Sequence, residues 1–79
     1  MNLVRYQYPG PMKTNTYKKI EIVGTSPKSF SDAVQNGLGR AAETVKNLDW
    51  FEVTELRGRI ENGAVGQFQV TLKIGFRLE

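Results

Sequence analysis

The chain contains neither cysteine nor histidine, and these two absences exclude several kinds of chemistry. Without cysteine there is no disulfide and no thiolate metal ligand. Without histidine there is no imidazole to act as a base, a nucleophile or a metal ligand. Ser-His-Asp catalysis, Cys-His catalysis and the usual zinc sites are therefore excluded.

Long apolar runs are also lacking, and the chain is short. With no stretch of membrane-spanning length and no recognisable signal peptide, we expect a cytoplasmic protein without a membrane partner. A domain of 79 residues buries only roughly 60–65% of the surface of its unfolded chain. Because no disulfide or thiolate metal site adds stability, we expect self-association to do so. The net charge of +3 is spread along the chain, as on an ordinary solvated surface.

The N-terminal 16 residues differ from the rest of the chain. They include the breaker cluster Pro9-Gly10-Pro11 and end in a polar stretch. We interpret residues 1–16 as a weakly ordered extension and residues 17–79 as a single folded domain.

A strand and a helix are predicted next. Alternation of isoleucine with charged residues predicts a strand over 17–24. Ser26 is a suitable N-cap, and Pro27 fits the first helical position. Apolar residues at three- and four-residue spacing after them predict a helix over 27–47. This helix contains Gly37 and Gly39. Each lowers helix stability by up to about 1 kcal/mol relative to alanine. Their presence therefore indicates the close approach of another segment, as expected in contacts between subunits.

Two further strands complete the pattern. We predict one over 49–61, with a bulge at Gly58, and one over 65–78, joined by the hairpin turn Asn62-Gly63. The last strand has an unbroken apolar face formed by Phe68, Val70, Leu72, Ile74 and Phe76. The predicted fold class is α+β: a β-α-β-β order with a three-stranded antiparallel sheet and one helix on its apolar face.

The side of this sheet that faces away from the helix carries the only tryptophan, Trp50. Phe51 and Val53 claim the helix side of their strand, so Trp50 lies on the opposite side among polar residues. That side is predicted to present Trp50, Glu52, Thr54, Gln67, Gln69, Thr71 and Lys73.

This combination allows two interpretations. An indole can stack on a flat heteroaromatic ring while an amide such as that of Gln69 reads the ring's edge, and Arg57 and Arg77 can hold an anionic tail. Alternatively, Trp50 is an anchor between subunits, the glutamines are solvated sheet residues and the arginines neutralise carboxylates. The pattern alone leaves both interpretations open.

Three segments resemble the dodecin family: Tyr17-Lys18-Lys19-Ile20-Glu21-Ile22-Val23-Gly24-Thr25-Ser26, Leu48-Asp49-Trp50-Phe51-Glu52-Val53, and Gln69-Val70-Thr71-Leu72-Lys73-Ile74-Gly75-Phe76-Arg77-Leu78. The resemblance implies the β-α-β-β fold and assembly into a hollow homo-dodecamer. It also implies a flavin ligand (FMN, riboflavin or FAD), stacked in pairs between symmetry-related tryptophans. Since some bacterial members bind coenzyme A, this is a second candidate ligand.

The resemblance further implies roles for four residues. Trp50 matches the tryptophan that stacks on the flavin ring, Gln69 the glutamine that hydrogen-bonds its polar edge, and Arg57 and Arg77 match arginines of bacterial members. The implied function is non-catalytic: flavin storage or buffering and protection from flavin photochemistry.

Two other functions are alternatives. A nucleic-acid-binding sheet also uses positive charge and exposed aromatic rings, although such sheets usually display several aromatics, and one is evident here. A flavoenzyme needs room for a second substrate against the flavin ring, and flavins that stack in pairs leave little room there.

Overall fold

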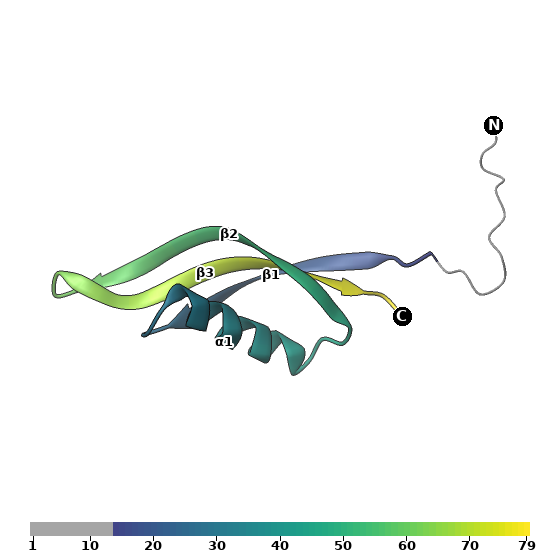
Figure 1. The fold of residues 1–79 in the computed structure, drawn as a ribbon, viewed down its shortest axis with the longest axis horizontal. Helices are drawn as coiled ribbons and strands as arrows, with labels where there is room; N and C mark the ends of the chain where they lie inside the picture. Colours follow the sequence, from purple (N-terminus) through teal and green to yellow (C-terminus); the bar gives the residue numbers. More distant parts are fainter. Residues whose placement is uncertain (1–13) are drawn as a thin grey trace, which may run out of the picture.

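The computed structural model describes residues 14–79 as one three-stranded sheet with a single helix on one side (Figure 1). The elements are β1 (Tyr17–Ser26), α1 (Phe30–Ala42), β2 (Leu48–Glu61) and β3 (Ala64–Arg77). β3 is the central strand, and β1 and β2 pair with it antiparallel on either side. The predicted β-α-β-β fold is therefore confirmed, while residues 1–13 of the predicted extension lie outside the described residues.

The core lies between α1 and the middle of β3. Alternate residues of β3 face the helix, and Val70, Leu72 and Ile74 are fully buried there. The helix packs against β1 and β3, so Phe51 and Val53, on the same side of β2, remain 46% and 43% exposed. In the described part of the chain, the helix thus covers two of the three strands on its side of the sheet.

The connection between β1 and α1 differs from its prediction. β1 continues to Ser26, and the helix begins only at Phe30, with Ser29 as its N-cap: Ser29 Oγ accepts a hydrogen bond from the Asp32 N–H at 2.9 Å. Ser26 is 1% exposed, and its hydroxyl donates to Asp32 Oδ2 at 2.7 Å. The assignments of Ser26 as the cap and Pro27 as the first helical residue were wrong, because the buried hydroxyl of Ser26 closes the end of the strand instead.

The helix is also shorter than predicted at its other end. It stops at Ala42, and Asn47 adopts a left-handed backbone conformation with φ of 65°. The Asn47 carbonyl accepts from the Arg77 N–H at 3.1 Å, and its side-chain amide donates to the Arg77 carbonyl at 3.3 Å. These bonds fix the loop against the end of β3, which is incompatible with a helix through residue 47. No helix within residues 14–79 combines the length and apolar character needed to cross a membrane.

The two helix glycines have different surroundings. A Cβ added to Gly37 would lie 3.2 Å from Gly24 Cα, so helix and strand backbones touch at this point. The predicted close approach is therefore confirmed at Gly37, within the subunit rather than between subunits. Around Gly39 no described atom lies within 4 Å of such a Cβ.

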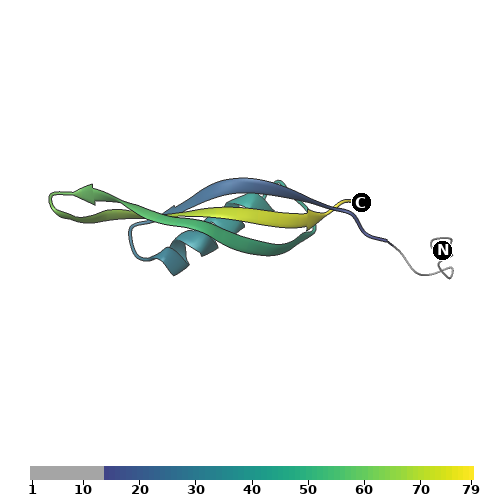
Figure 2. The same cartoon turned by 90° about the horizontal axis from the view of Figure 1, so that it is seen from above.

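The β2–β3 hairpin extends beyond the helix (Figures 1 and 2). Its turn is Asn62-Gly63, as predicted, with φ of 53° and 75°, both positive as a two-residue hairpin turn requires. The predicted bulge at Gly58 is wrong, because Gly58 pairs regularly with Phe68. Register shifts instead lie between Leu48 and Trp50, between Val53 and Glu55, and between Arg59 and Ile60.

Candidate ligand-binding face of the sheet

We call the side of the sheet opposite α1 the bare face. Directly opposed residues of paired strands share a face, so the register defines its members. They are Tyr17, Lys19, Glu21, Val23 and Thr25 from β1, Trp50, Glu52, Glu55, Arg57 and Arg59 from β2, and Gln67, Gln69, Thr71, Lys73, Gly75 and Arg77 from β3. The bare face therefore carries an indole, two amides and charges of both signs.

Trp50 lies over the backbone of the central strand. It pairs with Gly75, close to the C-terminal end of β3. A Cβ on Gly75 would fall 2.3 Å from indole atoms of Trp50, so the ring occupies the place a side chain would take. The indole remains 42% exposed. One side of the ring is thus backed by the sheet while part of it stays open.

A second aromatic ring reaches the same spot from β1. The rings of Tyr17 and Trp50 have centroids 5.2 Å apart and an interplanar angle of 57°, within the usual range for an attractive aromatic pair. We refer to Tyr17, Trp50 and Gly75 as the indole cluster. Arg77 is opposite Tyr17 in the register, so its guanidinium originates next to this cluster. Within residues 14–79 no ion pair involves it.

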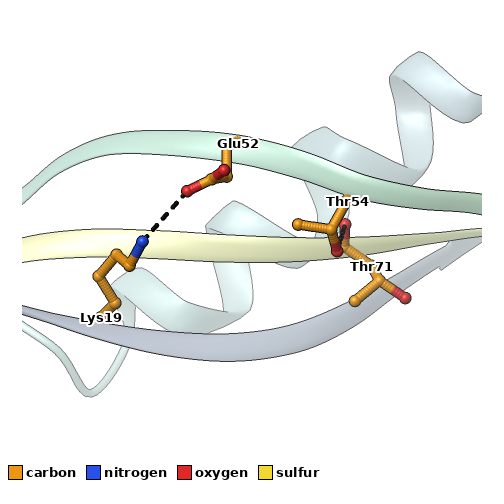
Figure 3. Close-up of polar contacts among 4 residues, drawn as sticks. All are labelled: Lys19, Glu52, Thr54 and Thr71. Atoms are coloured by element: carbon orange, nitrogen blue, oxygen red, sulfur yellow. Dashed lines mark hydrogen bonds and ion pairs between the residues drawn. The ribbon is translucent and has the colours of Figure 1, made fainter.

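An ion pair borders the indole cluster on the next row of the sheet. Lys19 reaches across β3 from β1, and its Nζ lies 3.3 Å from Glu52 Oε1 on β2 (Figure 3). Both side chains are about half exposed. The pair links the two outer strands on the bare face.

The bulge in β2 decides which residues reach the other end of the bare face. Thr54 is the extra residue, and its hydroxyl donates to the Thr71 carbonyl at 3.3 Å (Figure 3). Glu55 takes the position opposite Thr71, and Arg57 takes that opposite Gln69. The bulge thus shifts the alternation by one residue and brings Glu55, which the sequence did not place on this face, opposite Thr71.

Arg57 and Gln69 form a second group, which we call the amide cluster together with Gln67 and Glu55. The Gln69 amide donates to Gln67 Oε1 at 2.8 Å, which leaves the Gln69 carbonyl oxygen as an acceptor. Arg57 Nη1 lies 3.6 Å from Glu55 Oε1, and the same carboxylate oxygen accepts from the Thr71 hydroxyl at 3.3 Å. The Glu55 carboxylate orients the Arg57 guanidinium, which stays largely exposed and keeps N–H donors that this ion pair does not use.

The four predicted site residues thus fall into two groups. Trp50 and Arg77 lie at one end of the bare face, while Gln69 and Arg57 lie together at the other. The β3 partner of Trp50 is six positions from Gln69, which corresponds to about 20 Å along a strand. One subunit does not bring Trp50 and Gln69 together.

Sequence reasoning missed Tyr17, Glu55 and Gly75. Strand alternation already put Tyr17 on the same side as Lys19. Its contact with Trp50 depends on the register of both outer strands against β3, which no local pattern encodes. Glu55 was missed because the position of the bulge was not recognised.

Fold and site together define a small α+β protein with an exposed indole and an amide cluster on one side of a single sheet. The Dodecin family model matches residues 16–79. The curated dodecin of Thermus thermophilus is 52% identical over 63 residues, which cover 80% of this chain and 91% of that protein. The chain therefore belongs to the dodecin family.

Solved structures agree with this assignment. The dodecin from Streptomyces coelicolor matches with a TM-score of 0.83 and 54% identity, over 86% of this chain and 97% of that one. The dodecin from Streptomyces davaonensis matches with a TM-score of 0.83 and 49% identity, over 85% and 98% of the two chains. Dodecins are small oligomeric binding proteins, and assembly as dodecamers is known for the family.

One relative is named after a metal ion. The calcium dodecin of Mycobacterium tuberculosis is 27% identical over 64 residues, covering 81% of this chain and 90% of that protein. Within the described part of the present chain, no group of three or more acidic side chains lies close enough to hold a metal ion.

Proposed function

We propose that this protein binds flavin without catalysing a reaction, and that it stores or buffers flavin and limits its photochemistry. The observation that carries the proposal is the position of Trp50: an exposed indole laid against a glycine on the bare face of the sheet. A ring that leaves one face open offers a flat apolar surface of the size that a planar heteroaromatic ligand needs.

The chemistry of the surrounding residues fits a flavin. Stacking on an aromatic ring contributes about 1–3 kcal/mol for a nucleic-acid base, and the flavin ring is a larger planar heteroaromatic. The free carbonyl oxygen of Gln69 can accept from a ring N–H of the flavin. Arg57 and Arg77 supply guanidinium groups for a ribityl phosphate.

The site is completed by a second copy of the chain. Because Trp50 and Gln69 lie about 20 Å apart within one subunit, a ligand that touches both must lie where the indole cluster of one copy meets the amide cluster of another. Self-association, which the family's dodecameric assembly supports, thus builds the site as well as stabilising the small domain.

Variants of the Thermus relative point to the same three positions. Its solved variants replace one tryptophan and two arginines, which follow the tryptophan after 7 and 27 residues. Arg57 and Arg77 follow Trp50 at these same spacings. This agreement supports Trp50, Arg57 and Arg77 as the residues to test first.

Photoprotection follows from the electronic character of the rings. A flavin supplies an electron-poor ring that absorbs blue light. Trp50, which is electron-rich, donates an electron to the excited ring and takes it back, so the energy is released as heat. A protein that performs only this cycle needs no base or nucleophile, in agreement with the absence of cysteine and histidine.

The test is a riboflavin titration of the purified full-length protein, with absorption, fluorescence and particle size recorded. We expect strong quenching of bound flavin in a particle much larger than the 8.9 kDa chain. Trp50→Leu should weaken binding roughly 5- to 150-fold, the equivalent of one stacking contact. Trp50→Phe should retain part of the affinity but leave the bound flavin brighter.

Phe30→Leu is the matched control, because Phe30 is an exposed aromatic residue that contacts Phe68 on the helix side. It should bind and quench like the wild type. A Trp50 variant whose bound flavin stays as dark as in the wild type would overturn the proposal.

A further inference from the structure

We propose that Tyr17 is a positioning residue that holds the indole of Trp50 flat against Gly75, so that the indole offers a single face to a ligand. This inference rests on the proposed flavin site and names a further residue of it. Tyr17 itself contacts the indole rather than the ligand, so its role is to fix the ring that stacks.

The register of the sheet brings the two rings together. Trp50 extends from β2 and Tyr17 from β1, the two strands that flank β3. Their β3 partners, Gly75 and Arg77, are alternate residues on the same face. The two rings therefore converge from opposite edges of the sheet, and their centroids are 5.2 Å apart.

Gly75 makes this convergence possible. It is the position at which a side chain would enter the space of the indole, with a Cβ only 2.3 Å from ring atoms. Glycine is buried there because the ring covers it. Backbone below and a phenol ring beside it therefore restrict the indole from two directions.

Charge pairing keeps a neighbouring side chain out of the space that the indole occupies. Lys19 is the β1 residue opposite Gly75, so its stem begins in the same row as the indole. Its ammonium leans to the next row, where it pairs with Glu52 at 3.3 Å (Figure 3). With the lysine drawn away from Gly75, the row is left to the indole, and Tyr17 is the side chain that contacts the ring.

A purely structural role for Tyr17 does not account for its position. Tyr17 is the first residue of β1, is 39% exposed, and stands apart from the buried cluster around Val70, Leu72 and Ile74. Its replacement leaves this buried cluster untouched, so the fold should persist. Its described aromatic partner is Trp50.

The test compares Tyr17→Leu with Tyr17→Phe in the full-length protein. Because Trp50 is the only tryptophan, time-resolved anisotropy of its fluorescence in flavin-free protein reports the freedom of this one ring. We expect a larger fast component in Tyr17→Leu and wild-type behaviour in Tyr17→Phe, which keeps the ring contact. Phe30→Leu, which removes an aromatic contact on the helix side, should leave Trp50 unchanged.

A second measurement connects the ring to the ligand. Riboflavin affinity should fall roughly 2- to 10-fold in Tyr17→Leu, the range expected for one aromatic pair, and the excited-state lifetime of the bound flavin should lengthen. Tyr17→Phe should restore both values.

The two proposals fail separately. Unchanged Trp50 anisotropy in Tyr17→Leu overturns the positioning role, whether or not riboflavin binds. If the wild type binds no flavin while Tyr17→Leu frees the indole, the flavin function is wrong and the positioning role stands.

Discussion

Trp50 and Gln69 share one face of the sheet, yet they lie at opposite ends of it, with about 20 Å of β3 between them. A flavin that stacks on the first and hydrogen-bonds the second must therefore bridge two copies of the chain. In this arrangement the ligand site exists only in the assembled protein, and each copy contributes a different half of it.

Complementation between two inactive variants tests this division of the site. Trp50→Leu and Gln69→Leu should each bind riboflavin weakly when assembled alone. After the two are unfolded, mixed in equal amounts and reassembled, about a quarter of the sites should receive the intact residue from each copy by random assortment. Titration of the mixture measures the recovered fraction, and no recovery above the separate variants would place both residues in one copy's site.

Gly75→Ala should disturb the indole and leave the fold intact. The added methyl group would overlap the ring of Trp50, and overpacking of this kind costs about 1–3 kcal/mol. Because an exposed side chain can swing away, we expect a shifted tryptophan emission maximum and weaker flavin quenching with little change in circular dichroism. Wild-type emission and quenching in Gly75→Ala would show that the ring is not seated on this residue.

The helix glycines should respond in opposite directions to alanine. Gly39→Ala should stabilise the protein by up to about 1 kcal/mol, because alanine favours the helix and no described atom lies within 4 Å of the new methyl group. Gly37→Ala should destabilise it, because its Cβ would press on Gly24. Thermal unfolding of the two variants in parallel checks both signs, and each variant serves as the control for the other.

Arg57→Ala should distinguish FMN from riboflavin. If the guanidinium binds the phosphate, FMN affinity should fall about 3- to 10-fold while riboflavin affinity changes little, a range that allows for solvent screening at this exposed position. Loss of Arg57 also leaves the Glu55 carboxylate without its partner, which adds repulsion against phosphate. Arg59→Ala, two residues further on the same face, is the matched control, and an equal loss for both flavins in Arg57→Ala would argue against a phosphate contact.

The sequence predicted the elements better than their ends. The alternation in β3 is long and unbroken, so its helix-facing residues could be assigned with no knowledge of the tertiary structure. Ser26 and Ser29 are equally good caps by residue type. The choice between them depends on the buried hydroxyl of Ser26 at the end of β1, which is a tertiary effect.

For the site, local alternation placed Trp50 and Gln69 on the correct side of the sheet but gave no distance between them. Their separation and the Tyr17 contact both depend on how three strands are aligned. Strand pairing between distant segments leaves little trace in a single sequence, since many residues tolerate the same pairing.

The extra residue at Thr54 constrains how this strand can change in length. Residues before it alternate in one phase, with Val53 toward the helix, and residues after it in the other, with Arg57 on the bare face. Deletion of this single codon would remove the bulge and leave one regular alternation, with Val53 and Leu56 still toward the helix and Arg57 still on the bare face. In evolution, the loss of this one residue should therefore be tolerated far better than the loss of one residue from a regular stretch of the strand, which exchanges the two sides beyond it.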